Sequence, residues 1–263
     1  MIKTVVIGSR GLIAPHLIRK LQSLGHEVKS FHHDQKVDIK KADYLFYVCS
    51  YGNHYHQKDS YQIFKANVLD YLTLLRQTID IQYKGFFYFS TSSVTLPVQT
   101  DYSDAKYVGE ILGKRYFKKY HKPIVSIRPA SVYGEGEAPF RFFPTLFKHF
   151  KSKSPFPLTE GSHDWIYVED FIDALILIME NVQRFLGKSV PIGTGIQTKN
   201  SQIVEMMTKI AGYKIKTFSS DKVKRHYDVK NWVSDASIIK SLGWMPKYTL
   251  FEALKKLYGL KTA

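Results

Sequence analysis

The sequence predicts an α/β fold built on a doubly wound, Rossmann-like parallel sheet with helices on both faces. Two observations predict it. Short apolar strand patterns alternate with helical patterns through the first half of the chain. The first strand pattern, at residues 5–7, also runs directly into a loop that contains Gly8 and Gly11. The alternation loosens after Pro129, which predicts a second, smaller C-terminal lobe.

The first half of the chain accounts for most of the predicted sheet. Expected strands cover residues 5–7, 27–31, 44–48, 86–89 and 124–127. Expected helices, which carry apolar residues at helical spacing, cover residues 12–24, 60–81 and 104–120. Because short crossovers between parallel strands are right-handed, these elements predict a sheet that is covered on both faces.

The second half contributes one more expected strand, at residues 189–192. Its expected helices cover residues 140–150, 168–182, 200–211, 236–242 and 250–257. We therefore predict a Rossmann-like domain from residues 1–130 and about 163–195. The smaller lobe would comprise residues 131–162 and about 196–263.

Composition restricts the class of protein. No apolar run reaches the roughly 18 residues that a membrane-spanning helix needs. The single cysteine, Cys49, excludes an internal disulfide and predicts a reducing compartment, so we expect a cytoplasmic protein without a membrane partner. The net charge of +15 fits attraction to nucleic acid, attraction to a phosphorylated ligand, or simply a lysine-rich solvated surface.

The loop after the first strand has the pattern of a dinucleotide site. Gly8 permits a tight turn, Gly11 allows the backbone to approach a pyrophosphate, and Ala14 allows close helix–strand packing. The following helix N-terminus would face the phosphates. An acid that binds the adenosine ribose is expected after the second strand, but His32 stands there and Arg10 lies in the loop. This favours NADP over NAD as the cofactor.

Two Tyr-x-x-x-Lys pairs occur, at Tyr61–Lys65 and Tyr102–Lys106. Residues four apart on a helix lie one turn apart on one face. An ammonium beside a phenol favours the phenolate, so either tyrosine could serve as a general acid/base. Each pair also has a serine upstream, Ser50 for the first and Ser92 for the second.

Taken together, these features resemble the extended short-chain dehydrogenase/reductase family, the NAD-dependent epimerase/dehydratase group that acts on nucleotide sugars. Six segments carry the resemblance in family order: residues 7–14 (IGSRGLIA), 89–94 (FSTSSV), 102–106 (YSDAK), 127–134 (IRPASVYG), 163–170 (HDWIYVED) and 242–246 (LGWMP). The resemblance implies that Tyr102, Lys106 and Ser92 are the catalytic residues. Tyr61 would then be a helix residue partly packed in the core.

The resemblance also implies the binding residues. The predicted cofactor site comprises Gly8, Ser9, Arg10, Gly11, Leu12, Ile13, His32, Ser50, Tyr102 and Lys106. The predicted substrate site comprises Ser92, Ser131 and Arg225, with Arg225 as the ligand of a nucleotide diphosphate. No carboxylate or cysteine is spaced to complete a metal site with the histidines, so we predict none.

The chain departs from the family pattern at several positions. About a dozen residues separate the second and third strands where the family fits another strand and helix, so we expect a sheet reduced by a strand. The loop between Ser92 and Tyr102 is short, and the serine strand lacks the Asp and Glu of the dehydratase branch. Ser131 and His163 replace a usual Asn and Arg.

These observations predict an NAD(P)-dependent epimerase or 4-ketosugar reductase acting at a ring carbon, C4, of a nucleotide sugar. The alternative is a dinucleotide-binding regulator or nucleic-acid-binding protein of the same fold without turnover. The catalytic set favours the enzyme and makes nucleic acid an unexpected partner. The helical regions 60–81 and 104–120 correspond to those through which the family forms homodimers, so we expect a dimer.

Overall fold

The computed structural model describes residues 1–219 and 229–260. Its centre is a six-stranded sheet of order β2-β1-β3-β4-β5-β9, in which all neighbouring strands are parallel. The strands are β1 (Lys3–Ile7), β2 (Glu27–Phe31), β3 (Tyr44–Tyr47), β4 (Gly85–Phe89), β5 (Ile124–Pro129) and β9 (Ser189–Ile192). The loop from β2 to β3 contains no strand or helix, in agreement with the expected reduction of the sheet.

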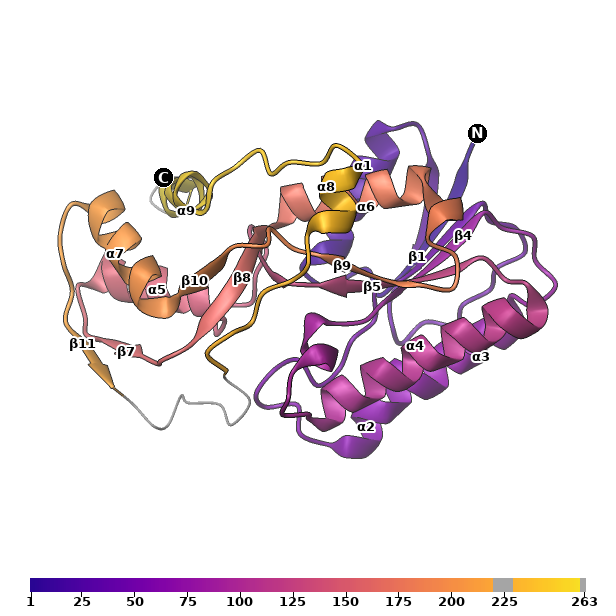
Figure 1. Cartoon of the computed structure of the whole chain (residues 1–263), viewed down its shortest axis with the longest axis horizontal. Coiled ribbons are helices and arrows are strands. Elements are labelled where there is room, and N and C mark those ends of the chain that lie inside the picture. The colour runs from indigo at the N-terminus through magenta and orange to yellow at the C-terminus, as the bar shows by residue number, and fades with distance from the viewer. Residues whose placement is uncertain (220–228, 261–263) are drawn as a thin grey trace.

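Helices cover both faces of this sheet, as the sequence predicts. One layer contains α3 and α4, and the opposite layer contains α1 and α6 (Figure 1). Their bounds are α1 (Ile13–Ser23), α3 (Asp70–Gln77), α4 (Asp101–Tyr120) and α6 (Val168–Glu180). The central strand β4 is buried at every residue, which explains its continuous run of aromatic residues.

The side on which the chain adds strands to the sheet changes between β1 and β3. Strand β2 lies on one side of β1 and β3 lies on the other, so the carboxyl ends of β1 and β3 flank a topological switch point. The backbone N–H groups of Gly8 and Ser9 both donate to the carbonyl of Phe31, which ties the loop after β1 to the end of β2. Open α/β sheets bind their ligands at this position.

The helix predicted at residues 60–81 is interrupted. It consists of α2 (Ser60–Phe64), a π-helical turn (Lys65–Leu69) and α3. The wider turn offers the carbonyls of Ala66 and Asn67 to the hydroxyls of Tyr47 and Tyr88, at 2.6 and 3.0 Å. These two buried tyrosines therefore anchor the π-helical turn to the neighbouring strands β3 and β4.

The second half adds two small sheets. One has the order β10-β8-β6 and the other pairs β11 with β7. The sequence patterns predict none of these strands as such, although the motifs at residues 127–134 and 163–170 overlap β6 and β8. The strands are β6 (Ser131–Tyr133), β7 (Phe156–Leu158), β8 (Ser162–Tyr167), β10 (Gln197–Lys199) and β11 (Thr217–Ser219). The remaining α-helices are α5 (Phe142–Ser152), α7 (Asn200–Ala211), α8 (Ser237–Ser241) and α9 (Leu250–Leu260).

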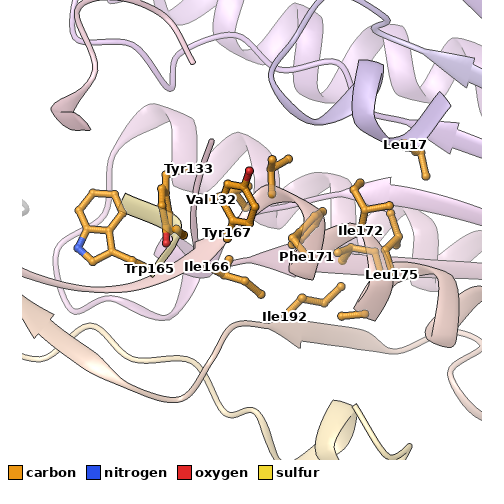
Figure 2. Close-up of a cluster of buried hydrophobic side chains, with 14 of the residues drawn as sticks. Leu17, Val132, Tyr133, Trp165, Ile166, Tyr167, Phe171, Ile172, Leu175 and Ile192 are labelled. Atoms are coloured by element: carbon orange, nitrogen blue, oxygen red, sulfur yellow. The ribbon is translucent and has the colours of Figure 1, made fainter. Parts of the chain in front are cut away.

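One hydrophobic cluster joins the central sheet to the C-terminal elements. Tyr133 and Trp165 from the small sheet, Phe171 from α6, and Leu17 from α1 belong to it (Figure 2). Because this core is continuous, the two-part division at residues 1–130 with 163–195 and 131–162 with 196–263 stays a prediction. Within the described residues, no helix is long and apolar enough to cross a membrane.

Candidate active site

Helix α4 positions the predicted catalytic pair. Its N-terminus is fixed by a capping box, in which Thr100 Oγ1 accepts from the Ser103 N–H and Ser103 Oγ accepts from the Thr100 N–H. Tyr102 lies in the first turn and Lys106 lies one turn later on the same face. The cap therefore fixes where α4 begins, and with it the position of the Tyr102 and Lys106 side chains relative to the carboxyl edge of the sheet.

Lys106 is fully buried beneath this edge. Its Nζ donates to the carbonyl of Cys49 at 3.0 Å and to that of Phe89 at 2.7 Å. These carbonyls lie at the ends of β3 and β4. An ammonium has three N–H donors, and the third has no acceptor among the described residues. The Nζ lies 5.9 Å from the centre of the Tyr102 ring. Burial lowers the pKa of Lys106 from 10.5 to about 7.

This shift predicts a pH dependence of stability. Between the folded pKa of about 7 and the unfolded value of 10.5, the unfolded chain retains a proton that the folded chain has released. The free energy of unfolding of the wild type should then rise with pH relative to Lys106→Met, by at most about 1.4 kcal/mol per pH unit. Urea unfolding of both proteins from pH 6 to 10 measures this difference; a pH-independent difference would contradict the shift.

The structure distinguishes the two Tyr-x-x-x-Lys pairs. Ser50 Oγ donates to the hydroxyl of Tyr102 at 3.3 Å, so Ser50 faces Tyr102 and not Tyr61. Tyr61 is 65% exposed, and Lys65 forms an ion pair with Asp70 at 3.0 Å. The expectation that Tyr61 is partly packed in the core is wrong, because it lies on the outer face of the short helix α2. The structure brings Ser50, Tyr102 and Lys106 together.

Ser92 begins a 3-10 turn (Ser92–Thr95) just beyond the carboxyl end of β4. It is buried, and its Oγ accepts a hydrogen bond of 3.0 Å from Trp232 Nε1. Thr91 caps the turn by accepting from the N–H of Ser93. The predicted catalytic serine is thus held at the end of a central strand, with its hydroxyl bonded to a residue from the C-terminal half.

The loop after β1 fits a dinucleotide. Gly8 has a φ of +97°, and a Cβ there would lie 2.6 Å from the backbone nitrogen of Cys49. A Cβ on Gly11 would meet no atom within 4 Å, so the backbone there is open to a ligand. Ser9 Oγ pairs with His32 Nδ1 at 2.8 Å, which places His32 beside the loop. Arg10 is exposed, while Leu12 and Ile13 are half-buried at the start of α1.

Gly11 offers a test of this cradle. Gly11→Ala has room for its methyl group, so we expect unchanged thermal stability but NAD affinity weakened by about tenfold or more, because the methyl blocks the approach to the pyrophosphate. Calorimetric titration measures the affinity. Gly259→Ala in α9, which also meets no atom, is the matched control and should bind NAD normally. Equal affinities for both variants would contradict the predicted cradle.

A buried carboxylate supports the catalytic helix from within. Glu110, one turn after Lys106, forms a two-pronged ion pair with Arg128 of β5, at 2.8 and 2.6 Å. Its oxygens also accept from the hydroxyls of Ser90 on β4's carboxyl end and Ser189 on β9, at 2.5 and 2.6 Å. Glu110 therefore fastens α4 to three neighbouring strands, so the depth of Lys106 depends on this network.

The predicted substrate residues are only partly described. Ser131 Oγ lies 3.4 Å from Nδ1 of the buried His163, and the ring of Trp232 packs 4.9 Å from that of His163. Asp164 is also buried and accepts from the backbone N–H groups of Thr194, Gly195 and Ser234. Arg225 lies outside the described residues.

The Cys49 thiol near the site is buried and free. Burial raises its pKa to about 11, which fits a packed thiol rather than a nucleophile. Across residues 1–219 and 229–260, no three histidine, cysteine or carboxylate side chains are grouped to hold a metal ion.

Comparison with known proteins decides the family. Residues 4–193 match the NAD dependent epimerase/dehydratase family. The chain belongs to this family. It is 24% identical to the CDP-abequose synthase of Salmonella typhimurium, over 96% of each chain. It is 23% identical to a low-salt glycan biosynthesis protein of Haloferax volcanii, over 72% of this chain.

Solved structures of family members share this fold. The UDP-glucuronic acid 4-epimerase of Bacillus cereus, in complex with UDP-glucuronic acid and NAD, superposes with a TM-score of 0.85 over 98% of each chain, at 22% identity. The matches span only 66% and 58% of the length of two curated relatives. The sequence-based preference for NADP gains no support, since this neighbour holds NAD.

Sequence reasoning missed two residues of the site. Glu110 had a signal, because it lies four residues after Lys106 and so shares the face of α4 that packs on the sheet. Trp232 had none, since it belongs to no motif and lies 140 residues from Ser92 in the chain.

Proposed function

We propose that the protein is an NAD-dependent nucleotide-sugar epimerase that acts at C4 of the sugar. The arrangement of Tyr102 over the buried Lys106 is the observation that carries this proposal. The ammonium is held by two carbonyls and faces the phenol ring, so it can stabilise the phenolate that a general base requires. A protein that only bound a dinucleotide would have no need of this pair.

The side chains have separate roles in this chemistry. Tyr102 takes the proton of the sugar hydroxyl as the hydride leaves the ring carbon, and it returns the proton when the ketone is reduced. Ser92 holds the reacting oxygen. Lys106 stabilises the Tyr102 phenolate and directs its remaining N–H toward the ribose of the cofactor. When bound, NAD supplies the hydride acceptor. Inversion at C4 requires the ketosugar to turn before reduction.

We propose NAD as the cofactor, because the family name and a structural neighbour both refer to NAD. The predicted cofactor residues are Gly8, Ser9, Arg10, Gly11, Leu12, Ile13, His32, Ser50, Tyr102 and Lys106. A 4-ketosugar reductase is the second candidate. A reductase would consume NADPH, and two residues favour that cofactor. His32 follows β2 where an acid would bind the ribose of NAD, and the cationic Arg10 lies in the neighbouring loop.

The substrate proposed is a nucleoside-diphosphate sugar. Ser131 and His163 line the predicted sugar side, and Arg225 remains the predicted diphosphate ligand. A homodimer through α2–α3 and α4 is also proposed, since residues of α4 such as Tyr107 and Ile111 are exposed, at 50% and 45%. Large exposed apolar side chains on one helix fit a contact with a second copy.

A substrate panel tests the proposal. The NAD-loaded protein is incubated with UDP-glucose, UDP-glucuronic acid and a CDP-linked sugar, and the products are separated by chromatography. We expect one of these to equilibrate with its C4 epimer without net NADH formation. Steady NADPH consumption with a 4-ketosugar would favour the reductase instead. No conversion of any sugar, together with tight and steeply salt-dependent RNA or DNA binding, would contradict both enzyme proposals.

A further inference from the structure

Trp232 reaches from the C-terminal half of the chain to the predicted catalytic serine. Its indole Nε1 donates to Ser92 Oγ at 3.0 Å. Its backbone N–H donates to Gln197 Oε1 at 3.1 Å, and Gln197 Nε2 donates to the carbonyl of Lys230 at 2.8 Å. Its ring packs against His163. Gln197 therefore fixes the backbone at Trp232, and the indole packs on His163 while its N–H is directed at Ser92.

The direction of this hydrogen bond is fixed by chemistry. An indole N–H can only donate, so Ser92 Oγ must be the acceptor. The proton of the Ser92 hydroxyl is then available for another partner, and it has no acceptor among the described residues. A hydroxyl that accepts a hydrogen bond also becomes a stronger donor.

We propose that Trp232 is a positioning residue that makes Ser92 the donor to the reacting oxygen of the sugar. This inference rests on the proposed function. When the sugar hydroxyl is oxidised, its oxygen loses its proton and becomes an acceptor only, so it needs donors in the transition state and in the ketone. Trp232 prevents Ser92 from turning its proton away from this oxygen. Its contribution should therefore appear in kcat more than in KM.

Neither of the other two tryptophans bonds to Ser92. Trp244 Nε1 donates to the backbone carbonyl of Asp170 at 3.1 Å, in the core. Trp165 is buried among aromatic rings, and its Nε1 has no partner among the described residues. Trp232 is half-buried. Subtracting the spectrum of Trp232→Phe separates its fluorescence from that of the other two tryptophans.

A first experiment needs no substrate. The emission of Trp232 is obtained by subtracting the spectrum of Trp232→Phe from that of the wild type. The same subtraction is made in the Ser92→Ala background, where Trp232 has lost its acceptor. Loss of the acceptor should shift the emission maximum of Trp232. An unchanged maximum would mean that the indole does not bond to Ser92, and the inference would be overturned while the proposed function stood.

A double-mutant cycle tests the role in catalysis. With whichever of UDP-glucose or UDP-glucuronic acid the wild type converts, Trp232→Phe should lower kcat by about 3- to 10-fold, the value of one neutral hydrogen bond, with little change in KM. In the Ser92→Ala background the same change should have no further effect. Trp232→His, which restores an N–H donor, should recover part of the loss.

The outcomes separate the two proposals. An equal loss of kcat with and without Ser92 would assign Trp232 a general structural role, and an effect confined to KM would make it a wall of the sugar site. Either result overturns the inference alone. If Ser92→Ala does not lower kcat, or if no nucleotide sugar is converted, the proposed function fails and the inference fails with it.

Discussion

Tyr102→Phe is expected to lower turnover of the nucleotide sugar by about 10²- to 10⁴-fold, the range that a general acid/base contributes. Phenylalanine keeps the ring of Tyr102, and the phenol oxygen accepts a hydrogen bond from Ser50, which is exposed, so removing the hydroxyl should leave folding unchanged. NAD affinity, measured by calorimetry, should also be close to that of the wild type. The rate is measured at saturating sugar, so that a defect in binding does not enter the comparison.

Tyr61→Phe is the matched control. It makes the same chemical change in the other Tyr-x-x-x-Lys pair, on an exposed helix face. Its turnover should equal that of the wild type. If Tyr61→Phe lost activity and Tyr102→Phe retained it, the assignment of the catalytic pair would be wrong.

Glu110→Ala should lower the free energy of unfolding by about 3–5 kcal/mol, more than any other substitution proposed for this protein. The reason is that it leaves Arg128 in a largely buried position without its carboxylate. The hydroxyls of Ser90 and Ser189 would also lose their acceptor. Chemical denaturation measures the change. Glu110→Gln preserves the shape and one acceptor oxygen, so its loss should be smaller and measurable even if the alanine variant folds poorly.

An exposed ion pair provides the comparison. Lys65 and Asp70 are each more than 40% exposed and lie 3.0 Å apart. Removing this pair with Asp70→Ala should cost about 0–1 kcal/mol. If Glu110→Ala cost no more than Asp70→Ala, the buried network would not be what fastens α4 to the sheet.

Much of the fold follows from patterns that lie close together in the chain. Strands β1, β3 and β4 contain continuous apolar runs, and Gly8 and Gly11 follow the first of these runs, so local signals are sufficient to predict them. The π-helical turn at Lys65–Leu69 could not be predicted, because it depends on Tyr47 and Tyr88, which reach it from separate strands. The three-residue strands of the C-terminal half are too short for periodicity to identify.

The candidate site likewise has features that local spacing predicts and features that depend on contacts between distant segments. Tyr102 and Lys106 share a local spacing, but their burial depends on the carbonyls of Cys49 and Phe89 at the ends of two other strands. The sequence alone left Ser50 as the serine upstream of Tyr61. Only the three-dimensional arrangement places it against Tyr102, because β3 ends beside the first turn of α4.

The most direct test of the central claim follows the hydrogen at C4. The protein, loaded with NAD, is given the nucleotide sugar that it converts, labelled with deuterium at C4, and the product is analysed by mass spectrometry and NMR. We expect a C4-inverted product that retains the deuterium on C4, with the same reaction nearly absent in Tyr102→Phe. Deuterium lost to water, or inversion that proceeds unchanged without the Tyr102 hydroxyl, would contradict the account.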